Sequence, residues 1–151
     1  MSPLQKALTT IREQASNSTE LGNAFERLSK VFLENDATQT QQYSKVWHYE
    51  DWAKEHEGYS VKDIGIDLVA KLRDEEGYCA VQCKFYEAEH SISKSDLDSF
   101  ISASSTNDFT RLMLIDTSTK PIGKHAQSVF DNINQEDIRM QLSEREERRI
   151  D

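Results

Sequence analysis

The chain has 151 residues, of which 36% are hydrophobic and 30% are charged, so it suits one domain with a core of its own and an ordinary soluble composition. We expect neither a signal peptide nor a membrane-spanning segment, because no apolar run of the needed length occurs. The net charge of −9 argues against a domain that binds DNA strongly by itself, since duplex binding usually rests on a basic surface that displaces counterions.

Two helices, a polar loop, a short strand and a short helix are expected ahead of residue 62. The first helix carries Leu8 and Ile11 on one apolar stripe, and the last helix turns Trp52 inward. Asn17, with Glu20 three residues on, is typical of a capping box at the start of the second helix. In chain order the expected ranges are 3–15, 18–34, 35–43, 45–49 and 50–56.

Residues 62–86 contain two apolar runs on either side of a charged turn that ends in glycine, which predicts a β-hairpin. Side chains alternate along a strand, so the even positions from Ile64 to Leu72 share one face and Asp67 lies on the other. In the second run the odd positions from 79 to 85 form the apolar set. Gln82 and Lys84 therefore point the opposite way, on the face of Asp67.

The register of this hairpin is predicted from its two apolar faces, because a slip of one residue would turn a whole strand over. Matching the faces pairs an even position with an odd one, for example Leu68 with Cys83. The loop then needs an even number of residues, and residues 74–77 supply four, with Gly77 available for a positive φ. Asp67 is expected directly opposite Gln82 or Lys84 unless a bulge intervenes.

After the hairpin the sequence predicts a loop, a helix, a buried strand, a second helix and a last short strand. Ser95 and Asp98 mark the first helix start, and the nearly continuous apolar run around RLMLID is typical of a strand covered on both faces. The segment from Thr117 to Lys120 ends that strand, where ligand sites often form, so we expect DNA contacts there. The expected ranges are 87–92, 95–104, 109–117, 123–133 and 138–142, followed by a charged helical tail at 143–151.

The two cysteines are expected to be reduced core residues of a cytoplasmic protein. Cys79 and Cys83 lie four apart in one strand, roughly 13 Å from each other at about 3.3 Å per residue, so they cannot bridge within it. Two cysteines also make a poor zinc site.

One carboxylate, one amide and one ammonium group thus converge on a single sheet face, beside Gly65, which leaves room for something to approach. Oxygen ligands suit Mg²⁺, which usually takes one or two protein carboxylates together with phosphate oxygens of the substrate. A lysine beside the metal stabilises charge on a phosphate or orients the attacking water. Asp67, Gln82 and Lys84 therefore indicate metal-assisted phosphodiester hydrolysis.

The motifs D-x-G-I-D-L-V-A at 63–70 and V-Q-C-K-F-Y at 81–86 resemble the PD-(D/E)XK nuclease superfamily in its Mrr-like form, and among its members the nuclease domain of the Type ISP restriction-modification enzymes. The resemblance implies that Asp67 binds the metal, that Gln82 completes its shell in place of the commoner acidic residue, and that Lys84 positions the attacking water. It also implies the backbone carbonyl of Cys83 as a further ligand and Mg²⁺, or alternatively Mn²⁺, as the cofactor.

Other polar residues keep two interpretations each. Glu26 either approaches the metal site, as a first-helix glutamate does in the resembled superfamily, or forms a surface pair with Lys30. Asp63 is either a substitute carboxylate or the cap of the turn into the hairpin. His48 and His56 are favoured as surface residues over metal ligands.

The sequence therefore predicts an α/β fold with a restriction-endonuclease-like core, one mixed sheet flanked by helices, over residues 1–142, and a probable linker to a following domain at 143–151. The predicted function is a Mg²⁺-dependent DNA endonuclease of a restriction-modification enzyme. By resemblance, double-stranded DNA is delivered by helicase-like translocase and recognition domains of a longer polypeptide. The alternative is a catalytically weak or inactive nuclease-fold module for DNA docking or protein interaction.

Overall fold

The computed structural model of the chain describes residues 2–62 and 65–143. Its elements are α1 (Pro3–Gln14), α2 (Ser18–Asn35), α3 (Ala37–Gln42), β1 (Tyr43–His48), α4 (Tyr49–Lys54), β2 (Leu68–Leu72), β3 (Tyr78–Lys84), α5 (Lys94–Ala103), β4 (Phe109–Asp116), α6 (Lys124–Asp131) and β5 (Glu136–Gln141). Asp63 and the expected tail after its first residue lie outside the described residues. No helix in the described ranges is long and apolar enough to cross a bilayer.

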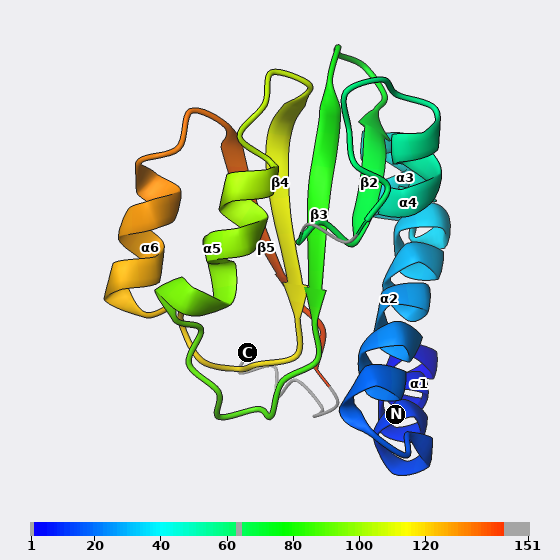
Figure 1. Cartoon of the computed structure of the whole chain (residues 1–151). Helices are drawn as coiled ribbons and strands as arrows, with labels where there is room; N and C mark the ends of the chain where they lie inside the picture. The colour runs from blue at the N-terminus through cyan, green and yellow to red at the C-terminus, as the bar shows by residue number, and fades with distance from the viewer. Residues whose placement is uncertain (1, 63–64, 144–151) are drawn as a thin grey trace.

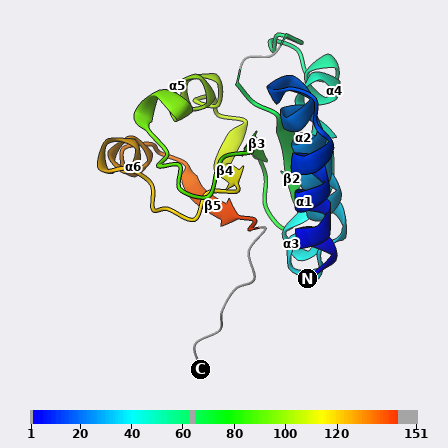
Figure 2. The ribbon, with the colours of Figure 1, turned by 90° about the horizontal axis from the view of Figure 1, so that it is seen from below.

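The five strands form one mixed sheet in the order β1-β2-β3-β4-β5. β1, β2 and β3 are antiparallel neighbours, whereas β4 runs parallel to β3 and β5 parallel to β4. Figure 1 shows α1 and α2 on one side of the sheet and α5 and α6 on the other, and the view from below in Figure 2 shows the same two layers. The predicted α/β fold with one mixed sheet flanked by helices is confirmed.

Three apolar clusters fix the helices to the two faces of the sheet, and the third joins Phe130 of α6 to Leu114 of β4. Phe25 of α2 packs in one cluster with Leu68 and Val81, and Trp52 of α4 packs in another with Val69. β4 contributes to both faces and is almost wholly buried, as its continuous apolar run predicts. Burial on both faces makes the hairpin and β4 the centre of the fold.

The first two helices begin where the sequence predicts. The Asn17 side chain accepts a hydrogen bond from the Glu20 N–H, which caps α2. The Glu20 carboxylate, however, accepts from the Ser16 N–H at 2.8 Å rather than from the Asn17 backbone. A complete capping box instead opens α1, between Ser2 and Gln5.

The predicted polar loop at 35–43 is wrong, because α3 occupies most of it. The Asp36 carboxylate caps this helix by accepting from the N–H groups of Thr38 and Gln39. At its other end the Arg73 guanidinium donates to the Thr40 carbonyl at 2.9 Å. Alanine and glutamine are good helix formers, but α3 buries no residue, so it has no apolar stripe by which to recognise it.

The predicted parity of the hairpin is confirmed and its register is wrong by two residues. Leu68 pairs with Val81, not with Cys83, and even positions of β2 face the same cluster as odd positions of β3. The Leu72 N–H donates to the Gly77 carbonyl, so the loop lies one residue earlier than expected. Gly77 has φ of 105°, which is the positive value predicted for it.

The remaining elements follow the prediction apart from the start of α5. Its cap is Ser93 with Asp96, which form a full capping box, and not Ser95 with Asp98. The two serines have the same spacing to an aspartate, so the local pattern fits either start. β4, α6 and β5 lie within two residues of their expected bounds.

Candidate active site

Asp67 lies immediately before β2, at a break in the regular ladder. Its N–H donates to the carbonyl of Val81 at 2.9 Å, although the strand partner of Val81 is Leu68. Two successive residues thus share one partner, as in a β-bulge, which interrupts side-chain alternation and re-aims the bulged residue. Ile66 accordingly packs in the cluster of Val69 and not, as expected, on the face of Leu68.

The Asp67 carboxylate reaches across to the neighbouring strand. Its Oδ2 accepts the N–H of Cys83 at 2.7 Å, a short charge-assisted hydrogen bond. The contact fixes the carboxylate beside the backbone that lies between Gln82 and Lys84. The two halves of the sequence motif therefore meet at one bond, although the bulge replaces the simple shared face that alternation predicted.

Gln82 is 5% exposed, and its amide is only half satisfied. Its Nε2 donates to the Gly65 carbonyl at 3.3 Å, whereas its Oε1 is buried without a hydrogen-bond partner among the described residues. An oxygen of this kind is rare in folded proteins and calls for an explanation such as an ion or water. Gln82 thus holds, next to the Asp67 segment, a buried oxygen that no described residue satisfies.

Gly65 does not leave the open space expected of it. Its φ is 103°, and a Cβ there would lie 2.9 Å from the backbone of Ser99 in α5. A side chain would therefore collide with a helix backbone that cannot move cheaply. The glycine lets α5 pack against the entry to β2, and the approach to Asp67 lies elsewhere.

Lys84 ends β3 and is half-buried. Its ammonium has no hydrogen bond or ion pair within the described ranges. Its partner in the parallel ladder is Asp116, but the Asp116 carboxylate is held by Arg139 at 2.9 Å. The lysine charge is thereby left available.

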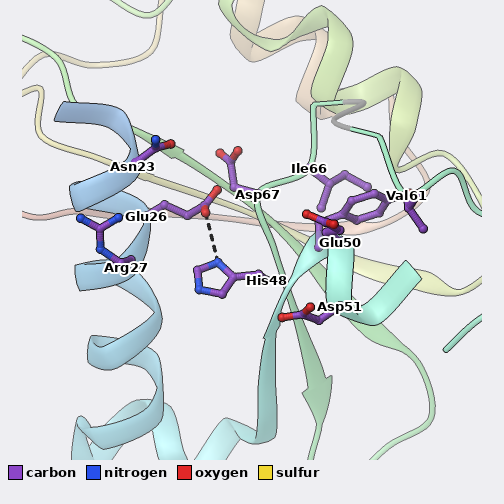
Figure 3. A pocket seen from close by; sticks show the side chains of 10 residues that line it. Asn23, Glu26, Arg27, His48, Glu50, Asp51, Val61, Ile66 and Asp67 are labelled. Carbon is purple, nitrogen blue, oxygen red and sulfur yellow. Dashed lines mark hydrogen bonds and ion pairs between the residues drawn. The ribbon is translucent and has the colours of Figure 1, made fainter. Parts of the chain in front are cut away.

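Glu26 does not form the surface pair with Lys30, and it lines the same hollow as Asp67. Its Oε2 lies 3.1 Å from Nδ1 of His48, the last residue of β1, while Lys30 pairs with Glu34 instead. Both Glu26 and Asp67 line one open hollow of about 420 Å³, shown in Figure 3, where their side chains approach from α2 and from the start of β2. Gln82, Cys83 and Lys84 do not line it.

The Cys83 thiol is buried near the carboxylates of Asp67 and Glu26, and both affect its pKa. Burial first, and then the negative charges of Asp67 and Glu26, hold the pKa of this thiol well above its usual value. The thiol thus stays protonated at neutral pH and is no nucleophile. Cys83 takes part in the site through its backbone.

The oxygen donors of this region suit a hard divalent cation. Asp67 and Glu26 supply carboxylates, and Gln82 supplies the buried amide oxygen without a partner. No group of three or more His, Cys, Asp or Glu side chains is already gathered as a metal cage within residues 2–62 and 65–143. The donors therefore fit Mg²⁺ bound together with water and substrate oxygens, the usual mode for this ion.

Two other expectations, DNA contacts at Thr117 and Ser118 and a surface role for His56, differ from the structure. Thr117 and Ser118 are buried, and their hydroxyls donate to the carbonyls of Tyr86, Ala88 and His90, so these two do not reach DNA as expected. His56 stacks on Trp52, with 4.1 Å between ring centroids, and packs the fold.

His48 lines the same hollow and contacts Glu26, whereas the sequence favoured a surface role for it. Its approach to Glu26 comes from tertiary packing across 22 residues of sequence, and no local pattern signals it.

The fold and this constellation define a nuclease-like α/β domain. A family model described as a restriction endonuclease, of the Mrr type, matches residues 34–151, and the chain belongs to that family. The match begins at the end of α2, so α1 and Glu26 lie outside it.

Among solved structures the chain is similar to an ATP-dependent Type ISP restriction-modification enzyme, LlaBIII, bound to DNA. The TM-score is 0.68 with 24% sequence identity over 90% of this chain, which shows the shared fold. This chain spans 8% of the length of that enzyme. The comparison with curated proteins finds no match.

Proposed function

We propose that the chain is a Mg²⁺-dependent endonuclease domain that hydrolyses phosphodiester bonds of double-stranded DNA. The observation that carries the proposal is the 2.7 Å hydrogen bond from the Cys83 N–H to the Asp67 carboxylate. It joins the two halves of the motif in a chain that belongs to a restriction endonuclease family. Asp67, Gln82 and Lys84 are the residues proposed to carry the chemistry.

Asp67 would hold the metal together with the carbonyl of Cys83 and the amide oxygen of Gln82. The buried Gln82 Oε1, which has no partner in the described part of the chain, supports its place in this set. A bound Mg²⁺, or Mn²⁺, would supply charge neutralisation at the phosphate and a more acidic water. Glu26 would add the negative charge that an amide at position 82 lacks, since it shares a hollow with Asp67.

Lys84 would donate to a phosphate oxygen or to the attacking water. Its ammonium is not paired with any described residue, and the neighbouring Asp116 is neutralised by Arg139. A cation held beside the backbone that Asp67 contacts stabilises the charge that develops on the phosphorane. The protein's own part is thus to orient the water and the phosphate.

DNA delivery would fall to other parts of a longer polypeptide. The similar Type ISP enzyme is far longer than this chain and was solved bound to DNA. The net charge of −9 gives the domain little counterion release of its own. Two predictions of the sequence stay untested: translocase and recognition domains in a longer polypeptide, and a cytoplasmic location in which both cysteines are reduced.

A non-catalytic module for DNA docking is the second candidate. Gln82 favours it, because a neutral amide binds Mg²⁺ more weakly than a carboxylate, and its Nε2 is already bonded to Gly65. The two candidates differ in one measurable respect, which is cleavage.

The test is nicking of supercoiled plasmid by the 151-residue chain and by Lys84→Ala, with and without Mg²⁺. We expect slow, scattered nicks that need Mg²⁺ and fall at least about a hundredfold in the variant, the usual loss for one electrostatic stabiliser. Mapping of the cut ends should show no single site. Equal nicking by both proteins, or efficient cutting at one defined sequence, would contradict the proposal.

A further inference from the structure

Arg27 differs from the other arginines that the structure describes. Arg12 pairs with Glu87, and Arg73 donates to backbone carbonyls of β1 and α3. The guanidinium groups of β4 and β5 are each held by a carboxylate at 3.0 Å or less. Arg27 alone has neither a hydrogen bond nor an ion pair in residues 2–62 and 65–143, and its side chain is exposed.

The sequence of α2 explains why this charge stays open. The positions three and four residues from Arg27 hold Asn23, Ala24, Lys30 and Val31, none of them acidic, so no helical ion pair can form. Lys30, one turn on, does have such a partner in Glu34. Asn23 is exposed as well, and its amide is without a partner in the described structure.

Asn23 and Arg27 form a polar ridge between two hollows. Both line the hollow that contains Glu26 and Asp67, and both line a second hollow of about 390 Å³ between α1 and α2. In Figure 3 the ridge lies on α2 beside Glu26, across the opening from Val61. The ridge thus stands at the rim of the proposed active site.

The rim needs a cation if a nucleic acid is to enter. Glu26, Glu50, Asp51 and Asp67 all line the same hollow, and like charges repel a phosphate chain. Lys54 is drawn to Glu50 on the far side of the opening, at 3.3 Å. Arg27 is therefore the guanidinium at this opening that remains able to take a phosphate in its planar fork.

We propose that Asn23 and Arg27 bind a backbone phosphate of the DNA next to the one that is cut, so that the duplex lies along α2. This inference rests on the proposed function. Arginine and asparagine are common phosphate donors in protein–DNA complexes, where such contacts set position rather than sequence preference. Thr117 and Ser118, where the sequence predicted DNA contacts, are buried and donate to backbone carbonyls instead.

The test compares nicking by the unaltered chain with Arg27→Ala, Arg27→Lys and Lys124→Ala. Lys124 is a matched control, because it is an exposed cation on α6, on the opposite side of the sheet. Arg27→Ala should raise the KM for plasmid about fivefold, with kcat within about twofold, because a ground-state contact is lost. The slope of log(kcat/KM) against log[salt] should flatten by about one for the lost phosphate contact.

Arg27→Lys should keep part of the affinity, and Lys124→Ala should leave both parameters and the salt slope unchanged. A second assay, binding of a fluorescent duplex in Ca²⁺ without cleavage, separates the two hypotheses. No nicking together with binding that depends on Arg27 would overturn the nuclease proposal and keep this one. Nicking and binding that respond alike to Arg27→Ala and Lys124→Ala, or no binding by any protein, would overturn the phosphate site.

Discussion

Two polar regions of the same sheet are built in opposite ways. At the β4–β5 edge the Asp116 carboxylate is wholly buried, and Arg139 donates to both of its oxygens while its third nitrogen donates to the Lys120 carbonyl. At the β2–β3 end, Gln82 keeps a buried oxygen without a partner, and Lys84 keeps an unpaired charge within the described structure. We call the first region the closed edge and the second the open end.

On the proposed function, the difference separates side chains that hold the fold from side chains that would bind a ligand. A buried polar group without a partner destabilises the fold by about 1–3 kcal/mol, so native proteins keep few of them. The closed edge removes this penalty at every atom of Asp116, whereas the open end retains it at Gln82. Changes at the closed edge should therefore alter stability, and changes at the open end should alter binding.

The largest effect is expected for Arg139→Ala. Loss of the guanidinium leaves the Asp116 carboxylate buried beside only the Ser118 N–H, which should lower the free energy of unfolding by about 3–5 kcal/mol. Urea denaturation measures it. Lys120→Ala breaks an exposed pair with Glu89 and should change stability by no more than about 1 kcal/mol. Similar losses for both variants would show that the closed edge is no stronger than the surface.

Metal binding should separate the residues of the open end. Asp67→Ala should abolish Mg²⁺ or Mn²⁺ binding, and Gln82→Glu should tighten it roughly tenfold by adding a charged oxygen. Titration calorimetry measures both. Neither variant should approach the instability of Arg139→Ala. Metal binding indifferent to Asp67 would remove the basis for the open end.

The sequence predicted correctly which residues of β2 and β3 share the apolar face, because period-two alternation depends only on which residues are apolar. It missed the register because four-residue loops at 73–76 and 74–77 keep the same parity, and only the structure shows which one forms, together with the hydrogen bond from the Arg73 N–H to the Gln42 carbonyl at 2.9 Å. The sequence allowed a bulge at Asp67 but did not predict one, since nothing local in the sequence requires it. α3 was missed because it has caps and good helix formers but no buried face.

The candidate site was predictable only where residues lie in one motif. Asp67, Gln82 and Lys84 sit at fixed spacing in a hairpin, so the sequence alone brings them near each other. The sequence left two roles open for Glu26, near the metal site or in a surface pair with Lys30. Because Lys30 pairs with Glu34 and Glu26 lines the hollow of Asp67, the structure favours the first role. His48 approaches it through the packing of α2 on β1, which no sequence pattern encodes.

His48 offers a smaller test of the open end. His48→Leu removes the group at 3.1 Å from Glu26, and we expect the Mg²⁺ concentration for half-maximal nicking to rise about tenfold, a usual effect of losing a supporting hydrogen bond. His48→Asn places a donor near the former Nδ1 and should restore most of the affinity. If His48→Leu and His48→Asn need the same Mg²⁺ concentration, His48 contributes packing alone and not a hydrogen bond to Glu26.

The smallest effect concerns the buried cluster that contains Cys79 of β3 and Tyr43 of β1, and it appears at alkaline pH. Burial raises the pKa of the Cys79 thiol from 9.0 to about 12, and burial and the nearby thiol also raise the pKa of Tyr43. The folded protein therefore keeps protons that the unfolded chain releases above pH 9. Stability is fully present below that pH and falls as the pH rises above it.

For Cys79 alone this pH dependence amounts to about 1 kcal/mol at pH 10, because each pH unit between the two pKa values changes the folding equilibrium about tenfold. Urea unfolding at several pH values from 8 to 11 measures the slope. Cys79→Ala should be less stable at pH 8, since it leaves a small cavity, yet it should lose less stability as the pH rises. The slope of stability against pH separates the effect of the thiol from the effect of the cavity, because the thiol titrates and the cavity does not. Parallel slopes for the two proteins would mean that the Cys79 thiol titrates as in the unfolded chain, which its complete burial should prevent.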